Sequence, residues 1–423
     1  MSQISSLGAY VAEARNRDEL VVQPRMGFAT PELMRAGLDA VRGAGPRVAG
    51  TITLDSFTRT GQFLRAGRAI ASGESLNGYP LVSHSDSSNS LLLRGMDLET
   101  FPVQVRHGSP KPQEIFRTML RLGLTVSEGG PVSYCLPYSR VPLRESIDAW
   151  AEGCQILAEG GQGSAHLETF GGCMLGQLCP PGLLIALSVL ECLFFVENGI
   201  RSVSLSYAQQ TNPQQDLDAI LALRTLAEEH LPDIDWHVVL YTFMGVYPKS
   251  TDGAAALLRE SAELAATSGC ERLIVKTTVE SQRIPTIEEN VAALRIAANA
   301  AHGVPRSAHL PRSEVIHEAS ALINTTLSLK TTVGDSLHEA FRLGLLDVPY
   351  CLHQDNRNQT RTSIDSNGSL RWASRGSMPL PAQSPPDEPG GAADRLLQML
   401  SFNQHRFDAL QLDDQLRARD EGD

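Results

Sequence analysis

The feature that most constrains this fold is a regular alternation of short, β-branched apolar runs with longer segments of helical periodicity. Eight runs are predicted as strands, and they lie at Val48–Leu54, Tyr79–Ser83, Pro102–Arg106, Leu124–Glu128, Ala165–Phe170, Ser202–Tyr207, Trp236–Thr242 and Arg272–Thr277. The segments between them place apolar residues three and four positions apart, which is typical of amphipathic helices. The chain therefore reads as a series of βα units.

Eight βα units over roughly 250 residues match the size of a closed parallel barrel. A doubly wound open sheet is the competing architecture, but no G-x-G-x-x-G string follows the first predicted strand. We therefore predict an α/β fold of the (β/α)8, or TIM, barrel type. The barrel is placed at residues 48–303, after an N-terminal extension (1–47) and before a mixed, partly irregular C-terminal region (304–423). Within that last region, the Pro-, Gly- and Ser-rich stretch 373–393 is predicted to be a linker.

Charge and composition exclude several classes of protein. The 423 residues carry a formal net charge of −12 and no block of Lys or Arg, so neither a nucleic-acid nor an anionic-membrane partner is expected. No apolar run reaches the roughly 18 residues of a transmembrane helix, because the longest one, 183–196, is interrupted by Glu191. The seven cysteines form no paired framework, and the first residues lack the order of a secretory signal. A reduced, cytoplasmic protein is expected.

Polar side chains gather at the predicted carboxyl ends of the strands, where the active site of a parallel barrel forms. They come from five strands and one earlier segment, and they are Arg25, Arg59, Arg106, His107, Glu128, Tyr134, Tyr138, Tyr207, Gln209, Gln210, Lys276 and Glu280. An arginine at a strand end can also form a surface ion pair, and a loop tyrosine can simply pack against its neighbours. Those explanations do not account for so many polar residues converging on one end of the barrel.

The residue types at this end indicate the kind of ligand. Guanidinium groups bind carboxylates and phosphates through two parallel hydrogen bonds. Several arginines with one glutamate, and without a glycine-rich phosphate loop, favour a small ligand that carries carboxylates and an ammonium group. An acidic amino acid fits, with its carboxylates on the arginines and its ammonium on Glu128. No H-x-H, H-x-x-x-H or C-x-x-C string supports a metal site, and no G-x-S-x-G predicts a nucleophile.

Longer strings make the pattern specific, and they are GTITLDSFTR, LNGYPLVSH, FPVQVRHG, EGGPVSYCLPYSR, SVSLSYAQQTN and KTTVE followed by IPT. Together they resemble the large (epsilon) subunit of coenzyme B12-dependent glutamate mutase, also called methylaspartate mutase, over about residues 23–300. The resemblance implies a (β/α)8 barrel and an isomerase of glutamate metabolism. The implied reaction is the radical carbon-skeleton rearrangement of L-glutamate to L-threo-3-methylaspartate, with adenosylcobalamin as the cofactor.

The resemblance also implies roles for individual residues. Substrate binding is implied for Arg25, Arg59, Arg106, His107, Glu128, Tyr134 and Tyr138. Glu128 is in addition the implied catalytic residue, which can accept a proton from the substrate ammonium. Cofactor binding is implied for Gly27, Asn77, Pro137, Tyr247, Lys276, Glu280 and Ile284, and Lys276 with Glu280 would hold the ribose of the adenosyl group. The family usually has Phe where Tyr247 stands.

One motif of the system is absent from this chain. The D-x-H-x-x-G string, whose histidine ligates cobalt, occurs nowhere in the sequence. In the family it belongs to a separate small subunit, so the resemblance implies a cobalamin-binding partner and a heterotetramer of two large and two small subunits. The chain alone is then expected to be inactive. After about Ala300 the match to the family is weaker.

Three alternatives stay open at this point. A barrel lyase could use Glu128 as a base on an acidic amino acid without B12. A non-catalytic scaffold could bind an amino acid or the small subunit without turnover. A mutase could act on a glutamate analogue such as 2-hydroxyglutarate, in fermentation or in the biosynthesis of a specialised metabolite.

Overall fold

The structure is a computed structural model, and it describes residues 6–171, 178–381 and 392–409. The strands are β1 (Val21–Pro24), β2 (Gly50–Thr53), β3 (Val103–Arg106), β4 (Val126–Gly129), β5 (His166–Thr169), β6 (Ser202–Ala208), β7 (Asp235–Tyr241), β8 (Arg272–Val275), β9 (Thr360–Ile364) and β10 (Leu370–Arg375). The helices are α1 (Ser6–Asn16), α2 (Pro31–Arg42), α3 (Ser56–Arg59), α4 (Phe63–Ser72), α5 (Asp86–Leu93), α6 (Gln113–Arg121), α7 (Leu143–Gly160), α8 (Pro181–Glu197), α9 (Pro213–His230), α10 (Thr251–Ser268), α11 (Ile287–Ala301), α12 (Ser313–Leu327), α13 (Val333–Leu343) and α14 (Ala392–Leu400).

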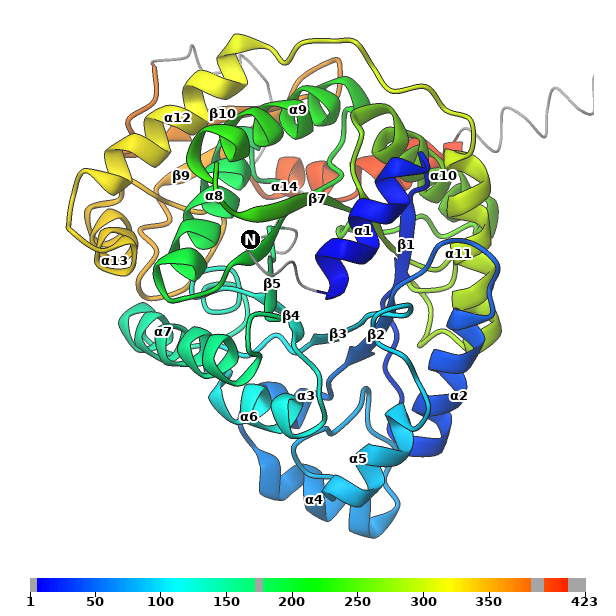
Figure 1. The fold of residues 1–423 in the computed structure, drawn as a ribbon. Helices are drawn as coiled ribbons and strands as arrows, with labels where there is room; N and C mark the ends of the chain where they lie inside the picture. Colours follow the sequence, from blue (N-terminus) through cyan, green and yellow to red (C-terminus); the bar gives the residue numbers. More distant parts are fainter. Residues whose placement is uncertain (1–5, 172–177, 382–391, 410–423) are drawn as a thin grey trace, which may run out of the picture.

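Strands β1 to β8 form one parallel sheet whose two edges meet. The sheet runs in the order β1-β8-β7-β6-β5-β4-β3-β2, and β1 lies against the start of β2 through a bridge between Val22 and Val48. There the Val22 N–H donates to the Arg47 carbonyl at 3.0 Å, and the Ala49 N–H donates to the Val22 carbonyl at 3.3 Å. Helices follow the strands in turn and surround the ring (Figure 1). The predicted (β/α)8 barrel is confirmed.

One of the eight predicted strands is wrong, and a different segment takes its place. At 79–83 only Tyr79 pairs, in a single bridge to Leu54. A turn begins at Pro80, whose carbonyl accepts the N–H groups of Ser83 and His84 at 3.0 and 3.1 Å. Proline has no N–H to offer a sheet, so the run cannot continue as an inner strand. The missing strand is β1, which lies in the segment that the sequence assigned to the N-terminal extension.

Helix α1 closes the amino-terminal end of the barrel. In Figure 1 it crosses in front of the ring. Its buried side chains form a small core with residues at the beginning of β1, β2 and β4. The core contains Leu7, Tyr10, Val11, Ala14, Val21, Ala49 and Val126. The Tyr10 hydroxyl also donates to the Val48 carbonyl at 2.7 Å. Because this end is covered, a ligand must reach the barrel at the carboxyl ends of the strands.

Helix α8 is apolar on all sides because it is buried between the barrel and the C-terminal helices α12 and α13. This environment explains why its sequence is hydrophobic without amphipathic periodicity. The part of the chain that the structure describes contains no helix both long and apolar enough to span a bilayer.

The C-terminal region packs onto the barrel. β9 and β10 form an antiparallel pair, and the Thr362 hydroxyl donates to the Leu178 carbonyl at 3.1 Å. After α14, Phe407 packs in one apolar cluster with Phe243 and Tyr247, which follow β7. These contacts place the end of the described chain beside the loops at the open end of the barrel.

The linker predicted at 373–393 is wrong over its first part. Residues up to 375 belong to β10, and Met378 and Leu380 are buried. Prolines and serines in this stretch suggested a solvated linker, but the alternating apolar side chains among them pack against the protein. Residues 382–391 lie outside the described part of the chain. The division of the chain into separate units at 47 and 304 stays a prediction.

Candidate active site

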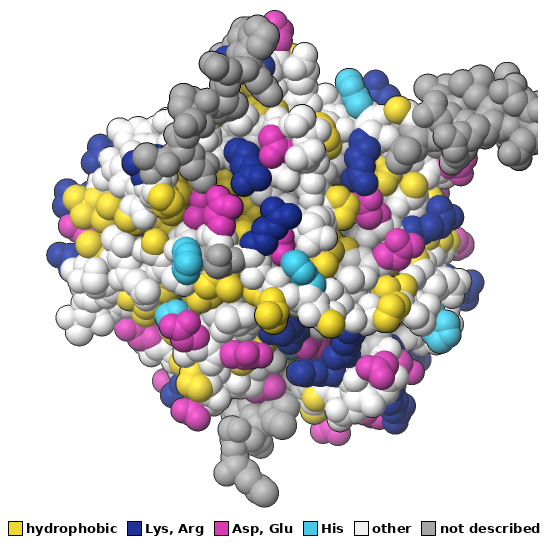
Figure 2. All heavy atoms as spheres, turned by 90° about the horizontal axis from the view of Figure 1, so that it is seen from above, with side chains coloured by type: hydrophobic (Ala, Val, Ile, Leu, Met, Phe, Trp, Pro, Cys, Tyr) yellow, Lys and Arg dark blue, Asp and Glu magenta, His cyan; other side chains and the backbone are white. Residues whose placement is uncertain are grey.

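A cavity of about 710 Å³ opens at the carboxyl ends of the strands. Its lining includes all seven predicted substrate-binding residues, namely Arg25, Arg59, Arg106, His107, Glu128, Tyr134 and Tyr138. With Lys111 and Arg140, the described residues of the lining include five cationic side chains and one carboxylate. The outer face seen in Figure 2 instead has acidic and basic side chains side by side. In a chain of net charge −12, this concentration of cations favours an anionic ligand.

Two neighbouring strands bring a buried ion pair to the cavity wall. Arg106 ends β3 and Glu128 lies near the end of β4, and the two strands pair in parallel. The Arg106 Nε lies 2.7 Å from Glu128 Oε2, and the side chains are 4% and 1% exposed. Burial acts to lower the pKa of Arg106, but the Glu128 charge outweighs it and raises that pKa above its ordinary value. Arg106 therefore stays a cation.

Arg59 supplies a second guanidinium from the short helix α3. Asp55 caps this helix by accepting the N–H groups of Phe57 and Thr58 at 2.8 and 3.1 Å. The Arg59 Nε donates to the Leu54 carbonyl at 2.8 Å, which holds the side chain toward the cavity. Among the described residues Arg59 has no salt-bridge partner within 4.0 Å. Burial lowers the pKa of Arg59, and the nearby cations Arg25 and Arg106 act in the same direction.

Arg25 follows β1 and is held by a carboxylate that follows the neighbouring strand, β8. Its Nη1 lies 2.7 Å from Glu280 Oε1, and both side chains are about one quarter exposed. Glu280 lies in the segment after β8, the strand that pairs with β1. The parallel pairing of β1 with β8 therefore brings these two residues together across 255 positions of sequence.

His107 is a neutral member of the site. Its Nδ1 accepts the Ser109 N–H at 3.0 Å, and its ring stacks on Trp150 with centroids 5.6 Å apart. Burial, with a further contribution from the Arg59 charge, lowers the pKa of His107 to about 3. The imidazole can therefore form hydrogen bonds in the cavity without adding positive charge at neutral pH.

A turn at residues 131–138 carries both tyrosines, and Glu191 of α8 anchors it. One Glu191 carboxylate oxygen accepts the N–H groups of Val132 and Ser133, each at 2.9 Å. The Tyr134 hydroxyl then donates to Glu128 through a short hydrogen bond, whereas Tyr138 lies at the rim with 46% exposure. Gly129 permits this geometry, because its φ is +134° and an added Cβ would lie 2.5 Å from the Tyr134 ring.

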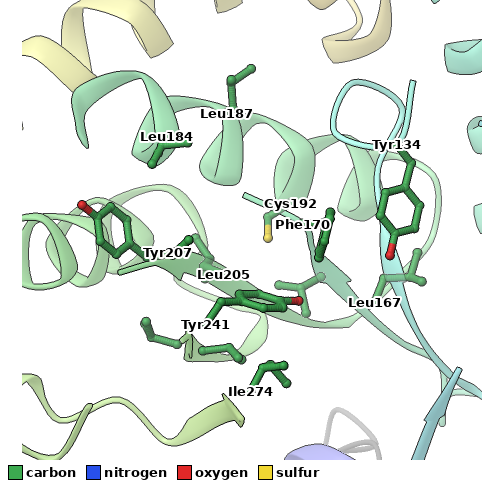
Figure 3. Close-up of a cluster of buried hydrophobic side chains, with 14 of the residues drawn as sticks. Tyr134, Leu167, Phe170, Leu184, Leu187, Cys192, Leu205, Tyr207, Tyr241 and Ile274 are labelled. Atoms are coloured by element: carbon green, nitrogen blue, oxygen red, sulfur yellow. The ribbon is translucent and has the colours of Figure 1, made fainter. Parts of the chain in front are cut away.

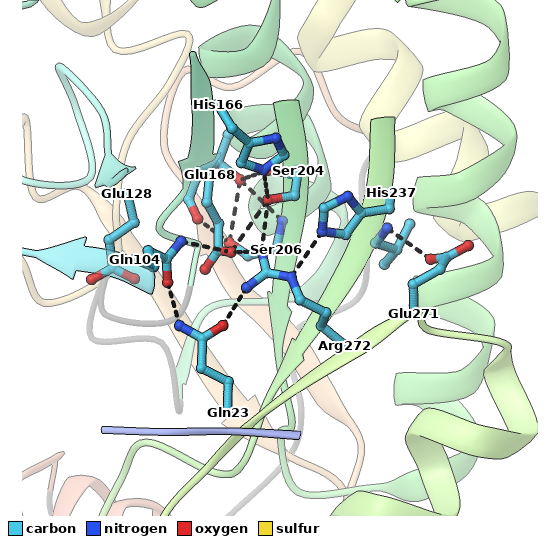
Figure 4. Close-up of polar contacts among 12 residues, drawn as sticks. Gln23, Gln104, Glu128, His166, Glu168, Ser204, Ser206, His237, Glu271 and Arg272 are labelled. Atoms are coloured by element: carbon cyan, nitrogen blue, oxygen red, sulfur yellow. Dashed lines mark hydrogen bonds and ion pairs between the residues drawn. The ribbon is translucent and has the colours of Figure 1, made fainter. Parts of the chain in front are cut away.

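Beneath the cavity lies a polar layer that the sequence did not predict as part of the site. At the floor of the cavity, Phe170 packs edge-on against both Tyr134 and Tyr241 (Figure 3). Figure 4 shows the ion pair of Glu168 and Arg272 within the ring, where branched aliphatic side chains are more usual. A usable signal was present, because Glu168 and Arg272 place opposite charges in two predicted strands.

The predicted cofactor residues fall into two groups. The first group lies at or beside the cavity. Pro137 lines the cavity, Glu280 pairs with the cavity residue Arg25, and Lys276 lies over the ring of Tyr247. Lys276 Nζ is 4.4 Å from the centre of the Tyr247 ring, and both residues are buried.

The other three have different surroundings. A Cβ at Gly27 would lie 2.3 Å from the Thr53 carbonyl oxygen, so this glycine allows two backbone segments to meet. Asn77 accepts the Ser56 N–H at 3.1 Å, and Ile284 is 62% exposed. Their implied contacts to a cofactor stay predictions. Within the described residues, no group of three His, Cys, Asp or Glu side chains could hold a metal ion.

Comparison with known proteins places the chain among similar sequences. A family model described as "Methylaspartate mutase E chain" matches residues 3–385. The glutamate mutase epsilon subunit of Desulfitobacterium hafniense is 31% identical over 394 residues, which cover 88% of this chain and 80% of that protein. The glutamate mutase epsilon subunits of Yersinia enterocolitica and Halobacterium salinarum are 30% and 29% identical, over 78% and 88% of this chain and 72% and 80% of theirs.

Proposed function

This chain belongs to the methylaspartate mutase E chain family, and on that premise we propose that it is the catalytic subunit of a glutamate mutase. The proposed reaction is the carbon-skeleton rearrangement of L-glutamate to L-threo-3-methylaspartate. The observation that supports this assignment is the convergence of Arg25, Arg59 and Arg106 with Glu128 in one cavity. Two carboxylates and one ammonium group are complementary to that set of charges.

The binding of glutamate requires the site to exchange partners. Arg106 Nη1 is buried and has no hydrogen-bond partner among the described residues, and Arg59 has no counter-ion there. Substrate carboxylates would occupy these two guanidinium groups. Arg106 would then form hydrogen bonds with the substrate carboxylate and interact less strongly with Glu128, which leaves Glu128 available for the ammonium group. Glu128 can take a proton from that ammonium and return it to the product.

Holding the substrate at both ends is the main task of the protein in such a reaction. A rearrangement that passes through separated fragments needs both fragments kept in place, which favours two anchoring arginines over one. The neutral His107 and the Tyr134 hydroxyl add hydrogen-bonding groups between those anchors. The cavity walls also limit the access of water to the reacting groups.

The residues beside the cavity fit the nucleoside part of adenosylcobalamin. The buried Tyr247 hydroxyl has no hydrogen-bond partner in the described part of the chain, and Lys276 and Glu280 could bind ribose hydroxyls. When bound, adenosylcobalamin supplies an organic radical that exchanges a hydrogen atom with the substrate. Glu280 would have to share or release Arg25 to take part in this binding, since the two form an ion pair here.

The cobalt ligand would come from a second protein. No D-x-H-x-x-G string occurs in this chain, and we propose a cobalamin-binding small subunit as the partner. A heterotetramer of two large and two small subunits is proposed from the family alone. A cytoplasmic location is proposed because the cysteines in the described part of the chain are unpaired.

Reconstitution tests the proposal. The purified chain is mixed with a small subunit that carries D-x-H-x-x-G and with adenosylcobalamin, and the conversion of L-glutamate to 3-methylaspartate is followed by NMR. We expect conversion only when all three components are present, with a radical signal in electron paramagnetic resonance. Ammonia release without B12 would indicate the lyase instead, and conversion of 2-hydroxyglutarate but not glutamate would indicate a mutase of another substrate.

The variant Glu128→Gln separates catalysis from assembly. Loss of a general base costs about 10²- to 10⁴-fold in kcat. The matched control is Glu152→Gln, which changes an exposed glutamate on α7. Equal turnover in both variants would contradict the role of Glu128.

A further inference from the structure

The hydroxyl group of Tyr241 lies between two buried carboxylates. It is 2.9 Å from Glu128 Oε2, and it makes a short hydrogen bond to Glu168 Oε1. All three side chains are at most 1% exposed. A phenol has one proton to donate, so at any moment Tyr241 can donate to only one of the two carboxylates.

Glu168, the carboxylate farther from the cavity, is held by partners that do not line the cavity. Arg272 forms an ion pair with its Oε2, and the Gln104 amide and the Ser204 hydroxyl donate to the same oxygen at 3.2 Å (Figure 4). Arg272 is itself fully buried and donates to His237 at 2.8 Å. No part of this group lines the cavity.

The other carboxylate, Glu128, has partners that a ligand can change. Its counter-ion Arg106 lines the cavity and has an unused donor, Nη1. Tyr134, which donates to Glu128 Oε1, lines the cavity as well. A bound carboxylate can therefore draw Arg106 away from Glu128, whereas none of the described partners of Glu168 lines the cavity.

We propose that Tyr241 is a positioning residue that donates to Glu128 while Glu128 is a carboxylate and turns to Glu168 when Glu128 takes up a proton. The proton that Glu128 takes comes from the substrate ammonium, and in this respect the proposal rests on the proposed function. Only the N–H bond of the ammonium breaks and only the O–H bond on Glu128 forms. The Tyr241 O–H bond stays intact and rotates between two acceptors.

The surroundings agree with a hydroxyl that keeps its proton. Burial, and then the charges of Glu128 and Glu168, raise the pKa of Tyr241 well above its ordinary value. The titratable or charged groups that face Glu128 come from five elements, and they are Arg106 and His107 at the end of β3, Tyr134 after β4, Glu168 on β5, Tyr241 on β7 and, behind Glu168, Arg272 on β8. Of these, His107 is neutral above about pH 3, and burial raises the pKa of Tyr134 well above its ordinary value.

Two sets of substitutions should shift the protonation equilibrium of Glu128 in opposite directions. In Tyr241→Phe, Glu128 loses a donor and faces Glu168 with no hydroxyl between them, so protonated Glu128 is favoured. In Glu168→Gln/Arg272→Gln, the second carboxylate and its counter-ion are removed together. Tyr241 then has Glu128 as its only anionic acceptor, which favours the carboxylate form of Glu128. General loosening of the barrel would not shift the titration in opposite directions.

The experiment is a pH titration of the free chain by infrared spectroscopy. The C=O band of protonated Glu128 is assigned by subtracting the spectrum of Glu128→Gln. Tyr241→Phe is expected to raise the midpoint of this band by about one to two pH units, and the double variant is expected to lower it by about one unit. The acidic limb of kcat/KM in the reconstituted enzyme is expected to move in the same directions.

Tyr207→Phe is the matched control. Tyr207 is also fully buried on a neighbouring strand and donates to a carboxylate, Asp216, at 2.8 Å. Figure 3 shows its hydroxyl pointing away from that of Tyr241. Tyr207→Phe should leave the Glu128 band unmoved. Equal shifts in the two tyrosine variants, or no upward shift in Tyr241→Phe while the chain stays folded, would overturn the proposal.

The infrared readout needs no turnover, so the two proposals can fail separately. A chain with the expected band shifts but no mutase activity after reconstitution would refute the proposed function and leave the shared hydroxyl established. An active mutase without the shifts would refute the role of Tyr241. If the double variant does not fold, Tyr241→Phe against Tyr207→Phe decides the question.

Discussion

Two buried ion pairs of the same chemistry lie in this barrel, and their surroundings differ. Arg272 and Glu168 lie inside the ring and away from the cavity, where Arg272 also donates to Gln23 at 2.5 Å. Arg106 and Glu128 lie at the cavity wall, where one donor of Arg106 has no partner among the described residues. The interior pair has its hydrogen bonds satisfied, and the pair at the wall does not.

This difference shows how one motif serves two purposes. A fully satisfied buried pair contributes a fixed arrangement, because no available partner is better than the existing one. A pair with an unused donor beside a cavity can accept a ligand without first losing all of its hydrogen bonds. Arg25 and Glu280 form a third pair that is partly exposed, and such a pair contributes little to stability.

The largest expected effect comes from removing the interior cation. Arg272→Met leaves Glu168 buried without a counter-ion, and we expect the free energy of unfolding to fall by about 3–5 kcal/mol. Urea denaturation measures this loss. Arg117→Met is the control, because Arg117 forms exposed ion pairs and its removal should change the free energy of unfolding far less. A similar small cost at Arg272 would mean that the interior pair is not structurally important.

Arg106→Met also leaves a buried carboxylate without its cation, but Glu128 keeps two tyrosine donors and borders the cavity, so this change should act more on activity than on stability. Arg106→Met is expected to remove about 2–5 kcal/mol of transition-state stabilisation. This corresponds to a decrease in kcat/KM for glutamate of about 30-fold to several thousand-fold. Arg106→Lys keeps the charge but loses the planar fork, so its loss should be smaller. The assay is the reconstituted reaction, with Arg117→Met again as the control. If Arg106→Met unfolds as readily as Arg272→Met, the two pairs do not differ as described.

The smallest effect is expected from replacing Glu191, a buried carboxylate without a counter-ion, and the size of this effect should depend on pH. Burial raises the pKa of Glu191 to about 7, from an ordinary value of 4.5. Since the folded state favours the protonated form, this contribution to stability is complete below about pH 4.5 and is lost as the pH rises through 7. Glutamine does not titrate, so Glu191→Gln should not lose this stability. Its free energy of unfolding should rise relative to that of the parent by up to about 3 kcal/mol as the pH increases over this range.

Chemical denaturation at pH 4.5 and 7.5 measures that gain, and an exposed glutamate provides the control for its sign. Hydrogen bonding from Gln113 lowers the pKa of Glu152, so Glu152→Gln should show a small change in the opposite direction. A pH-independent difference between Glu191→Gln and the parent would contradict the raised pKa.

Much of the site could be predicted because its residues follow strand ends in recognisable strings. Arg59, Arg106 and Glu128 were placed correctly at the open end of the barrel by the periodicity of the chain. Strand β1 (Val21–Pro24) has only two consecutive apolar residues before Gln23 and Pro24, so its sequence does not look like a strand, whereas the apolar run at Tyr79–Ser83 does. The pairing of Arg25 with Glu280 and of Glu168 with Arg272 could not be predicted, because each pair joins residues far apart in sequence.

The sequence by itself determined the alternation of strands and helices, because backbone periodicity is a local property of the chain. It also determined which polar residues follow the strands. Closure of the sheet decided everything that depends on distance between remote segments, including the shared hydroxyl of Tyr241 and the burial that keeps His107 neutral. The strength of a charge or hydrogen bond depends on its neighbours and on the exclusion of water, and both exist only once the ring has closed.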